Sequence, residues 1–142
     1  MTPVVRYPFL PRGGANGPLD LVPLLPACLS RNGIEVDVVG LVDSGATFSV
    51  LPYDVGALFG VDWNLLPNSL SIGGVGRRVP AKMLSLEMTF GPIGPVVQSF
   101  AWISDNSMPV IFGLVTFFLS VDVFFYRTRG YFEIQPATAA TP

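Results

Sequence analysis

The residues best placed to do chemistry are Asp43, Ser44 and Gly45, which follow directly after an apolar run ending in Leu41 and Val42. Glycine permits backbone angles and close approaches that a side chain would forbid. This order predicts a strand that delivers an acid to a site, where its carboxylate could transfer protons. Ordinary turns favour the same three residue types, so a plain turn between two strands is the alternative interpretation.

The composition narrows the kind of chemistry, because the chain contains no histidine. This absence removes the usual base of serine and cysteine hydrolases and the commonest ligand of a catalytic zinc ion. The remaining acid–base groups include ten carboxylates and four tyrosines, so an enzyme of this composition would most naturally use carboxyl chemistry. A pair of Lys82 with Ser85 or another serine is a less favoured alternative, because a lone lysine in a strand is more often a solvated charge.

Length, charge and cysteine content further limit the number of domains and the kinds of partner and metal site. The 142 residues suit one domain with a sizeable core. The net charge is −2 with no basic block, so nucleic acid is not expected as a partner. A single cysteine, Cys28, allows neither an intrachain disulfide nor a four-thiolate metal site. The amino end lacks the basic start and apolar core of a secretory signal, and we expect a cytoplasmic protein.

The rest of the chain must position Asp43, and most of it shows strand patterns. Residues 1–18 are rich in proline and glycine, which predicts an irregular arm. Asn32-Gly33 predicts a tight hairpin turn, and Pro52 and Gly60 bracket a predicted short helix. Strands are expected within 19–29, where Pro23 and Pro26 favour an edge or a bulge, and within 34–42, 47–51, 69–90, 96–103, 121–126 and 131–134.

These elements predict an all-β fold. Eight or nine short strands, two short helices and no alternation of strands with long helices favour a closed β-barrel over a layered α/β sheet. The barrel domain is expected to cover residues 19–136, followed by a loose tail over 137–142.

Two segments carry a resemblance to a known family. Residues Leu41 to Pro52 resemble the active-site loop of the aspartic proteases, specifically the short, single-lobed retropepsin-like branch, in which two hydrophobic residues precede Asp, Ser or Thr, Gly and Ala. Ile111-Phe112-Gly113, with the apolar stretch after it, resembles the strand and short helix that pass behind that loop and brace it. The resemblance spans most of residues 19–134 and implies a barrel of the retropepsin type.

In this resemblance the glycine-rich segment from Ile72 to Gly76 corresponds to the flap that closes over a substrate. Glycines would let such a hairpin bend and approach a peptide closely. A plain glycine turn is an equal alternative, whereas a dinucleotide-binding loop is disfavoured because Pro80 stands where its helix should start. The resemblance implies Asp43, Ser44 and Gly45 as the catalytic loop. The implied substrate-binding residues are Ala46, Thr47, Ile72, Gly73, Gly74, Val75, Gly76, Val110 and Ile111.

The chemistry of this family requires two facing carboxylates. One takes a proton from a water molecule, while the other, still protonated, hydrogen-bonds the carbonyl oxygen of the peptide. The chain holds a single Asp-Ser/Thr-Gly motif, so we expect a homodimer in which each chain supplies one Asp43. This route requires no metal and no organic cofactor.

One departure from the family concerns the dimer. Relatives often carry an arginine directly after the glycine of the second motif, paired with an acid shortly after the catalytic aspartate. This chain has Leu114 and Thr47 at those places. Contacts between subunits near the site are therefore expected to come from packing or neutral hydrogen bonds.

The sequence favours an aspartic endopeptidase that acts on peptides or proteins. One alternative is a catalytically silent module of the same fold, which dimerises or binds peptide without cutting it. Another is a membrane-associated domain anchored by the apolar run from Val110 to Tyr126. Asp122 would be costly in a bilayer, so buried core is the favoured interpretation of that run.

Overall fold

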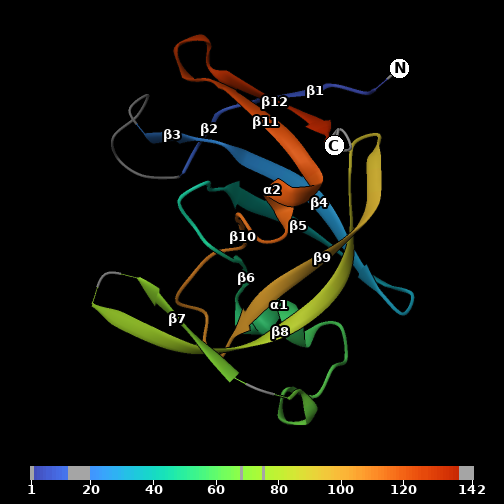
Figure 1. Cartoon of the computed structure of the whole chain (residues 1–142), viewed down its shortest axis with the longest axis vertical. Helices are drawn as coiled ribbons and strands as arrows, with labels where there is room; N and C mark the ends of the chain where they lie inside the picture. Colours follow the sequence, from blue (N-terminus) through green and yellow to red (C-terminus); the bar gives the residue numbers. More distant parts are fainter. Residues whose placement is uncertain (1, 13–19, 68, 75, 138–142) are drawn as a thin grey trace, which may run out of the picture.

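Short strands joined by tight turns make up most of the described chain, which comprises residues 2–12, 20–67, 69–74 and 76–137 of a computed structural model (Figure 1). The strands are β1 (Val5–Pro8), β2 (Leu10–Pro11), β3 (Leu21–Val22), β4 (Leu24–Arg31), β5 (Ile34–Val42), β6 (Ser49–Leu51), β7 (Ser69–Gly74), β8 (Arg77–Phe90), β9 (Ile93–Ile103), β10 (Ile111–Phe112), β11 (Val121–Tyr126) and β12 (Tyr131–Pro136). The helices are α1 (Tyr53–Ala57) and α2 (Phe117–Ser120), with short 3₁₀ turns at Trp63–Leu65 and Arg127–Arg129.

Six of the strands form a closed barrel, which confirms the predicted β-barrel. Their order is β4-β5-β10-β6-β9-β8, and the ring closes where β8 pairs with β4. The closing contact is short: only Cys28 to Ser30 lie opposite Glu87 to Thr89. β4 pairs on both sides, so the expected edge strand is wrong for it. Pro26 pairs with Val39 of β5 and lies outside the contact with β8, where its missing N–H costs no hydrogen bond to that strand.

The local sequence explains how the chain turns between β4 and β5 and then enters the core of the barrel. Asn32 and Gly33 adopt φ values of 50° and 83°, the left-handed conformation that a two-residue hairpin turn between β4 and β5 requires. Along β5 the burial increases from an exposed Ile34 to Val42, which is only 3 % exposed. The strand therefore runs from the surface into the core and ends directly at Asp43, as the sequence predicts.

Two groups of apolar side chains fill the interior. The larger group contains the bulky residues Trp102, Phe90, Phe100, Phe112, Phe117 and Phe132. A smaller group, Val50, Val79, Ala81, Ala101 and Ile103, lies between β6, β8 and β9. Phe48, Ile72, Met108 and Ile111 pack against the smaller group. This smaller group is the floor on which the candidate site is built.

The amino-terminal segment corrects one expectation. Residues Val5–Pro8 form a regular strand paired antiparallel with β12, so an irregular arm is wrong for this part of 1–18. Arg6 forms an ion pair with Glu133 across the two strands at 3.0 Å, and Tyr7 stacks on Phe132. β1 has a strand on one side only, an edge position that tolerates Pro8. Residues 13–18 and 138–142 lie outside the described part.

The apolar run from Val110 to Tyr126 is divided between β10, α2 and β11. Phe112 and Phe117 are fully buried, as expected for a core segment. Leu114, Leu119, Phe124 and Phe125 are exposed, so the expectation of buried core holds for only part of this run. In the described residues no helix is long and apolar enough to cross a membrane. The predicted helix after Pro52 is confirmed as α1, and Gly60 beyond it adopts a positive φ of 72°.

Candidate active site

Asp43 stands where β5 leaves the barrel wall. Its backbone N–H donates to the carbonyl oxygen of Phe112 at 3.0 Å, so the residue is still tied to β10. Its Oδ1 accepts the N–H of Gly45 at 2.8 Å, and its carbonyl oxygen accepts the N–H of Ala46 at 3.2 Å. The side chain is half-buried. One carboxylate oxygen is thus held by the loop, while Oδ2 accepts no hydrogen bond from the described residues.

The segment after β10 braces this loop from behind. Leu114 donates its N–H to the carbonyl oxygen of Ala46 at 2.9 Å, and Val115 donates to that of Thr47 at 2.8 Å. Gly113 donates to the hydroxyl of the fully buried Ser49 at 3.0 Å. The loop therefore has hydrogen bonds to a neighbouring backbone along most of its length, which restricts the position of the carboxylate.

Gly113 is required here for close approach rather than for its backbone angles. A Cβ atom built on it would lie 2.5 Å from the carbonyl oxygen of Phe48 and 2.8 Å from that of Ala46. Any side chain would push the loop away from its brace. Gly113 thus allows the segment after β10 to lie directly against the loop.

The β7–β8 hairpin supplies the other wall. It projects from the lower end of the barrel in Figure 1, with Gly73 opposite Arg78 and Gly74 opposite Arg77 near its tip. Between this hairpin and the loop lies a groove of about 460 Å³. We call it the Asp43 groove; it is lined by Asp43, Gly45, Ala46, Thr47, Phe48, Val50, Ser71, Ile72, Gly73, Arg78, Met108 and Ile111.

Most residues that the sequence singled out meet in this groove. Asp43, Gly45, Ala46, Thr47, Ile72, Gly73 and Ile111 line it directly. Ser44 is exposed beside Asp43, and Gly76 is exposed at the turn of the hairpin and is not among the described residues that line the groove. Gly74 pairs with Arg77 at the end of β7. Val75 lies outside the described residues. Val110 is 7 % exposed and packs into the larger core, because alternate strand residues face opposite sides and Ile111 takes the groove side.

Sequence reasoning missed several lining residues, of which Arg78 is the most informative. Its guanidinium donates to both the hydroxyl and the carbonyl oxygen of Ser71 across the hairpin. Arg78 pairs with Gly73, so strand alternation places it on the face of the hairpin opposite Ile72, and a charge beside a glycine turn gives no signal that it lines the groove. The other missed residues are Phe48, Val50, Ser71 and Met108.

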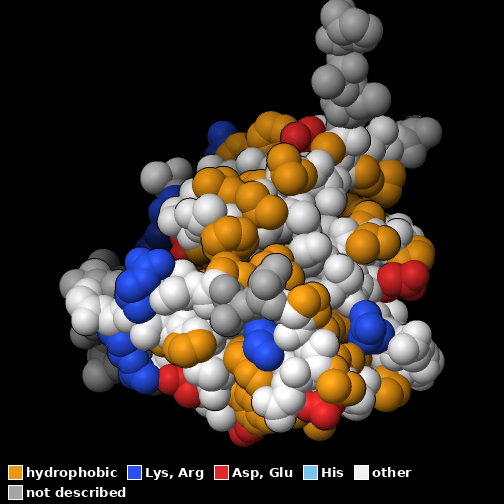
Figure 2. All heavy atoms as spheres, turned by 60° about the horizontal axis from the view of Figure 1, so that its bottom comes forward, with side chains coloured by type: hydrophobic (Ala, Val, Ile, Leu, Met, Phe, Trp, Pro, Cys, Tyr) orange, Lys and Arg blue, Asp and Glu red, His pale blue; other side chains and the backbone are white. Residues whose placement is uncertain are grey.

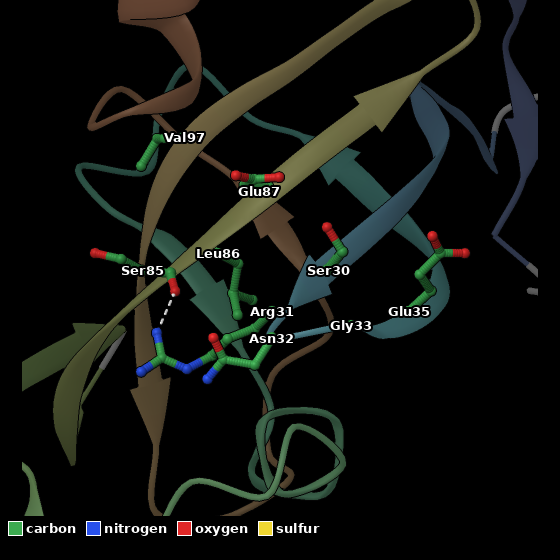
Figure 3. A pocket seen from close by; sticks show the side chains of 9 residues that line it. All are labelled: Ser30, Arg31, Asn32, Gly33, Glu35, Ser85, Leu86, Glu87 and Val97. Atoms are coloured by element: carbon green, nitrogen blue, oxygen red, sulfur yellow. Dashed lines mark hydrogen bonds between the residues drawn. The ribbon is translucent and has the colours of Figure 1, made fainter.

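A second hollow of similar volume, about 470 Å³, lies at the β4–β5 turn, and we call it the Arg31 hollow (Figure 3). In it Glu35 and Glu87 lie on either side of Ser30 in the strand register. Arg31 donates to the carbonyl oxygen of Ser85 at 3.0 Å, while its Nε is buried and has no hydrogen-bond partner among the described residues. Both carboxylates extend from exposed strand faces.

The chemistry open to the Asp43 groove follows from its lining. One carboxylate stands among apolar and neutral residues, with one arginine on the opposite wall. Within the described ranges no three His, Cys, Asp or Glu side chains gather in a way that could hold a metal ion. On the face that Figure 2 shows, basic and acidic side chains are scattered among apolar ones. The groove therefore suits an extended, largely neutral chain that passes beside an acid.

None of the family models, curated proteins or solved structures compared with the chain matches it.

Proposed function

We propose that this chain is an aspartic endopeptidase of the retropepsin-like type, active as a homodimer. The observation that carries the proposal is the placement of Asp43: a half-buried carboxylate on a backbone-braced loop, in a groove opposite a glycine-containing hairpin. Aspartic proteolysis needs this kind of fixed acid beside an extended peptide. The closed barrel with two short helices agrees with the fold that the family resemblance implies.

The count of carboxylates makes the second chain necessary. Among the described residues that line the groove, Asp43 is the only acid. Two carboxylates about 3 Å apart share one proton, because both cannot easily ionise together. A twofold pair of chains would place two Asp43 side chains face to face, with the exposed Ser44 hydroxyls available to hold the two loops together.

The proposed reaction then balances within the dyad. The ionised carboxylate takes a proton from water as the water oxygen bonds to the peptide carbonyl carbon. The protonated carboxyl donates its proton to the carbonyl oxygen, which gives a tetrahedral diol. As the C–N bond breaks, the protonated carboxyl gives its proton to the leaving nitrogen, and the ionised one takes a proton from a diol hydroxyl as the carbonyl re-forms, so the dyad again holds one proton.

A silent peptide-binding module remains the second candidate. The described residues form no ion pair at the loop, where Leu114 is 43 % exposed and Thr47 is also exposed, and this favours the silent module. A dimer held there only by packing could bind a peptide with its carboxylates too far apart to share a proton.

The test is a mixed peptide library incubated with the purified chain from acid to neutral pH. We expect cleavage by the wild-type chain and none by Asp43→Asn. Peptide binding without cleavage at any pH would favour the silent module, and cleavage by Asp43→Asn at the wild-type rate would exclude the proposed mechanism.

A further inference from the structure

Two neighbouring arginines on β8 point to opposite sides of the hairpin. Arg77 extends to Asp105 in the loop after β9, at 2.7 Å, and does not line the Asp43 groove. Arg78 is exposed on the face of the hairpin opposite Ile72 and Val79, where it spans the hairpin to Ser71 and also lines the groove. Successive strand residues face opposite ways, so the two guanidinium groups have separate roles. Arg77 ties the hairpin to the barrel, whereas Arg78 presents a cation to whatever fills the groove.

The guanidinium of Arg78 is fixed on one edge and open on the other. Its Nε donates to the Ser71 hydroxyl at 3.1 Å and its Nη2 to the Ser71 carbonyl oxygen at 2.8 Å. An arginine has five N–H donors, so three remain. Across the described part of the chain, those three find no acceptor, and no carboxylate lies within ion-pair distance of Arg78.

Gly73 makes room for this arrangement. A Cβ atom built on Gly73 would lie 3.1 Å from Nη1 of Arg78, so a side chain there would crowd the open edge. Gly73 thus leaves space for the guanidinium of Arg78, in addition to allowing the hairpin to bend. A held guanidinium loses less freedom on binding a partner than a mobile one, which favours a planar, two-oxygen acceptor.

We propose that Arg78 is a specificity-determining residue, which binds a carboxylate of the peptide in the Asp43 groove; this rests on the proposed function. The open edge of the guanidinium matches the two oxygens of a carboxylate. Most other lining residues are apolar or neutral, and Asp43 adds a negative charge to the same groove. A singly charged carboxylate therefore suits the groove better than a doubly charged phosphate.

The test uses capped octapeptides with leucine and phenylalanine at the two central positions and one glutamate moved through the six outer positions. A matched set carries glutamine instead, and a third set carries glutamine with a free carboxyl terminus. Binding is measured by competition against a labelled peptide on full-length Asp43→Asn protein, which keeps the groove but removes turnover. The third set separates a side-chain carboxylate from a terminal one.

At one outer position, or with the free terminus, we expect the carboxylate peptide to bind about 10-fold more tightly than its neutral match. Arg78→Gln, made in the same background, should abolish the preference. Arg78→Lys should retain only part of it, because an ammonium group lacks the two-pronged geometry. Arg77→Gln removes the same charge from the other side of the hairpin and should leave the preference intact.

Three outcomes would overturn the inference: equal binding of charged and neutral peptides at every position, a preference that survives in Arg78→Gln, or an equal loss for both peptide sets in that variant. Turnover by the wild-type chain is measured separately on the same peptides. A carboxylate preference without any turnover would leave the role of Arg78 intact and remove the proposed proteolysis.

Discussion

The Asp43 groove and the Arg31 hollow have nearly equal volumes, about 460 and 470 Å³, yet they place their charged groups in different ways. In the groove, the acid sits on a loop whose backbone is hydrogen-bonded to the segment after β10. In the hollow, Glu35 and Glu87 extend from exposed strand faces beside a surface turn. A fixed acid can meet a reacting bond in one geometry, whereas exposed glutamates sample many. Size therefore does not distinguish the two regions, but positioning does.

Removing an acid from each region should give the largest difference in peptide cleavage between the two regions. Asp43→Ala should reduce peptide cleavage about 10³-fold or more, because the dyad acts as a unit and no other acid among the described lining residues can replace it. Asp43→Asn should behave alike, and both variants should keep the circular dichroism spectrum of the folded barrel. The matched control is Glu87→Gln in the Arg31 hollow, which should cleave at the wild-type rate. An active Asp43→Ala variant would show that the wrong region was chosen.

One glycine in each region, Gly113 and Gly33, allows a test of how the local backbone affects stability and activity. Gly113→Ala places a methyl group against the Phe48 and Ala46 carbonyl oxygens, and should lower the free energy of unfolding by about 1–3 kcal/mol. It should also lower the activity of each folded molecule, because the loop that carries Asp43 must shift. Urea denaturation and assays on folded protein separate the two effects.

Gly33→Ala in the turn of the Arg31 hollow is the control. Nothing lies within 4 Å of an added Cβ atom there, but φ is +83°, so a cost of about 1–2 kcal/mol is expected from backbone strain alone. Activity per folded molecule should stay unchanged. If Gly113→Ala proved as active as Gly33→Ala, the brace would be unnecessary for placing the acid.

Much of this architecture could be predicted because its signals are local. Asn32-Gly33 specifies its own turn, and the increasing apolar content of 34–42 predicts a strand that ends in the core at Asp43. Alternation of apolar residues predicts which residues share a face, but Val110 and Ile111 are both apolar, so alternation could not decide which one faces the groove. The structure assigns Ile111 to the groove and Val110 to the core.

The features that could not be predicted depend on pairing between distant parts of the chain. The contact of β4 with β8 closes the barrel through three residues of each strand, too few to leave a pattern in the sequence. β1 pairs with β12 at the other end of the chain, and a segment rich in proline and glycine gives no sign of that distant partner. Arg78 was missed for a related reason, since its role depends on Ser71 and on the groove across the hairpin.

Apolar contacts in the groove should set the preference around the cut bond. Ile72→Ala should raise KM for peptides with large apolar residues there by about 10-fold, from the loss of apolar contact area of a few methylene groups. Val97→Ala in the Arg31 hollow, where Val97 is 67 % exposed, should leave KM unchanged. Cleavage profiles dominated by charged residues beside the cut bond would contradict this assignment.

The smallest effect on activity is expected from the ion pair between Arg77 and Asp105, which connects the β7–β8 hairpin to the loop after β9. The Ser107 hydroxyl, its backbone N–H and Arg77 hold the pKa of Asp105 below its ordinary value. Any stabilisation from this depressed pKa is present above the ordinary aspartate range and is lost as the pH falls through the lower pKa of the folded state. The pair should therefore persist in mild acid. Asp105→Asn should change KM a few-fold at most, since the pair is exposed; a large loss of activity would assign the pair a greater role.

The central claim is that two Asp43 carboxylates, one from each chain, form a single site. It is tested most directly by measuring specific activity during dilution, alongside sedimentation of the same samples. We predict that specific activity falls as single chains appear, and that excess Asp43→Asn chains suppress wild-type activity through mixed dimers. The pH profile should be bell-shaped in the acid range, with two apparent pKa values that belong to the pair. Constant specific activity at concentrations where sedimentation shows only single chains would contradict the claim.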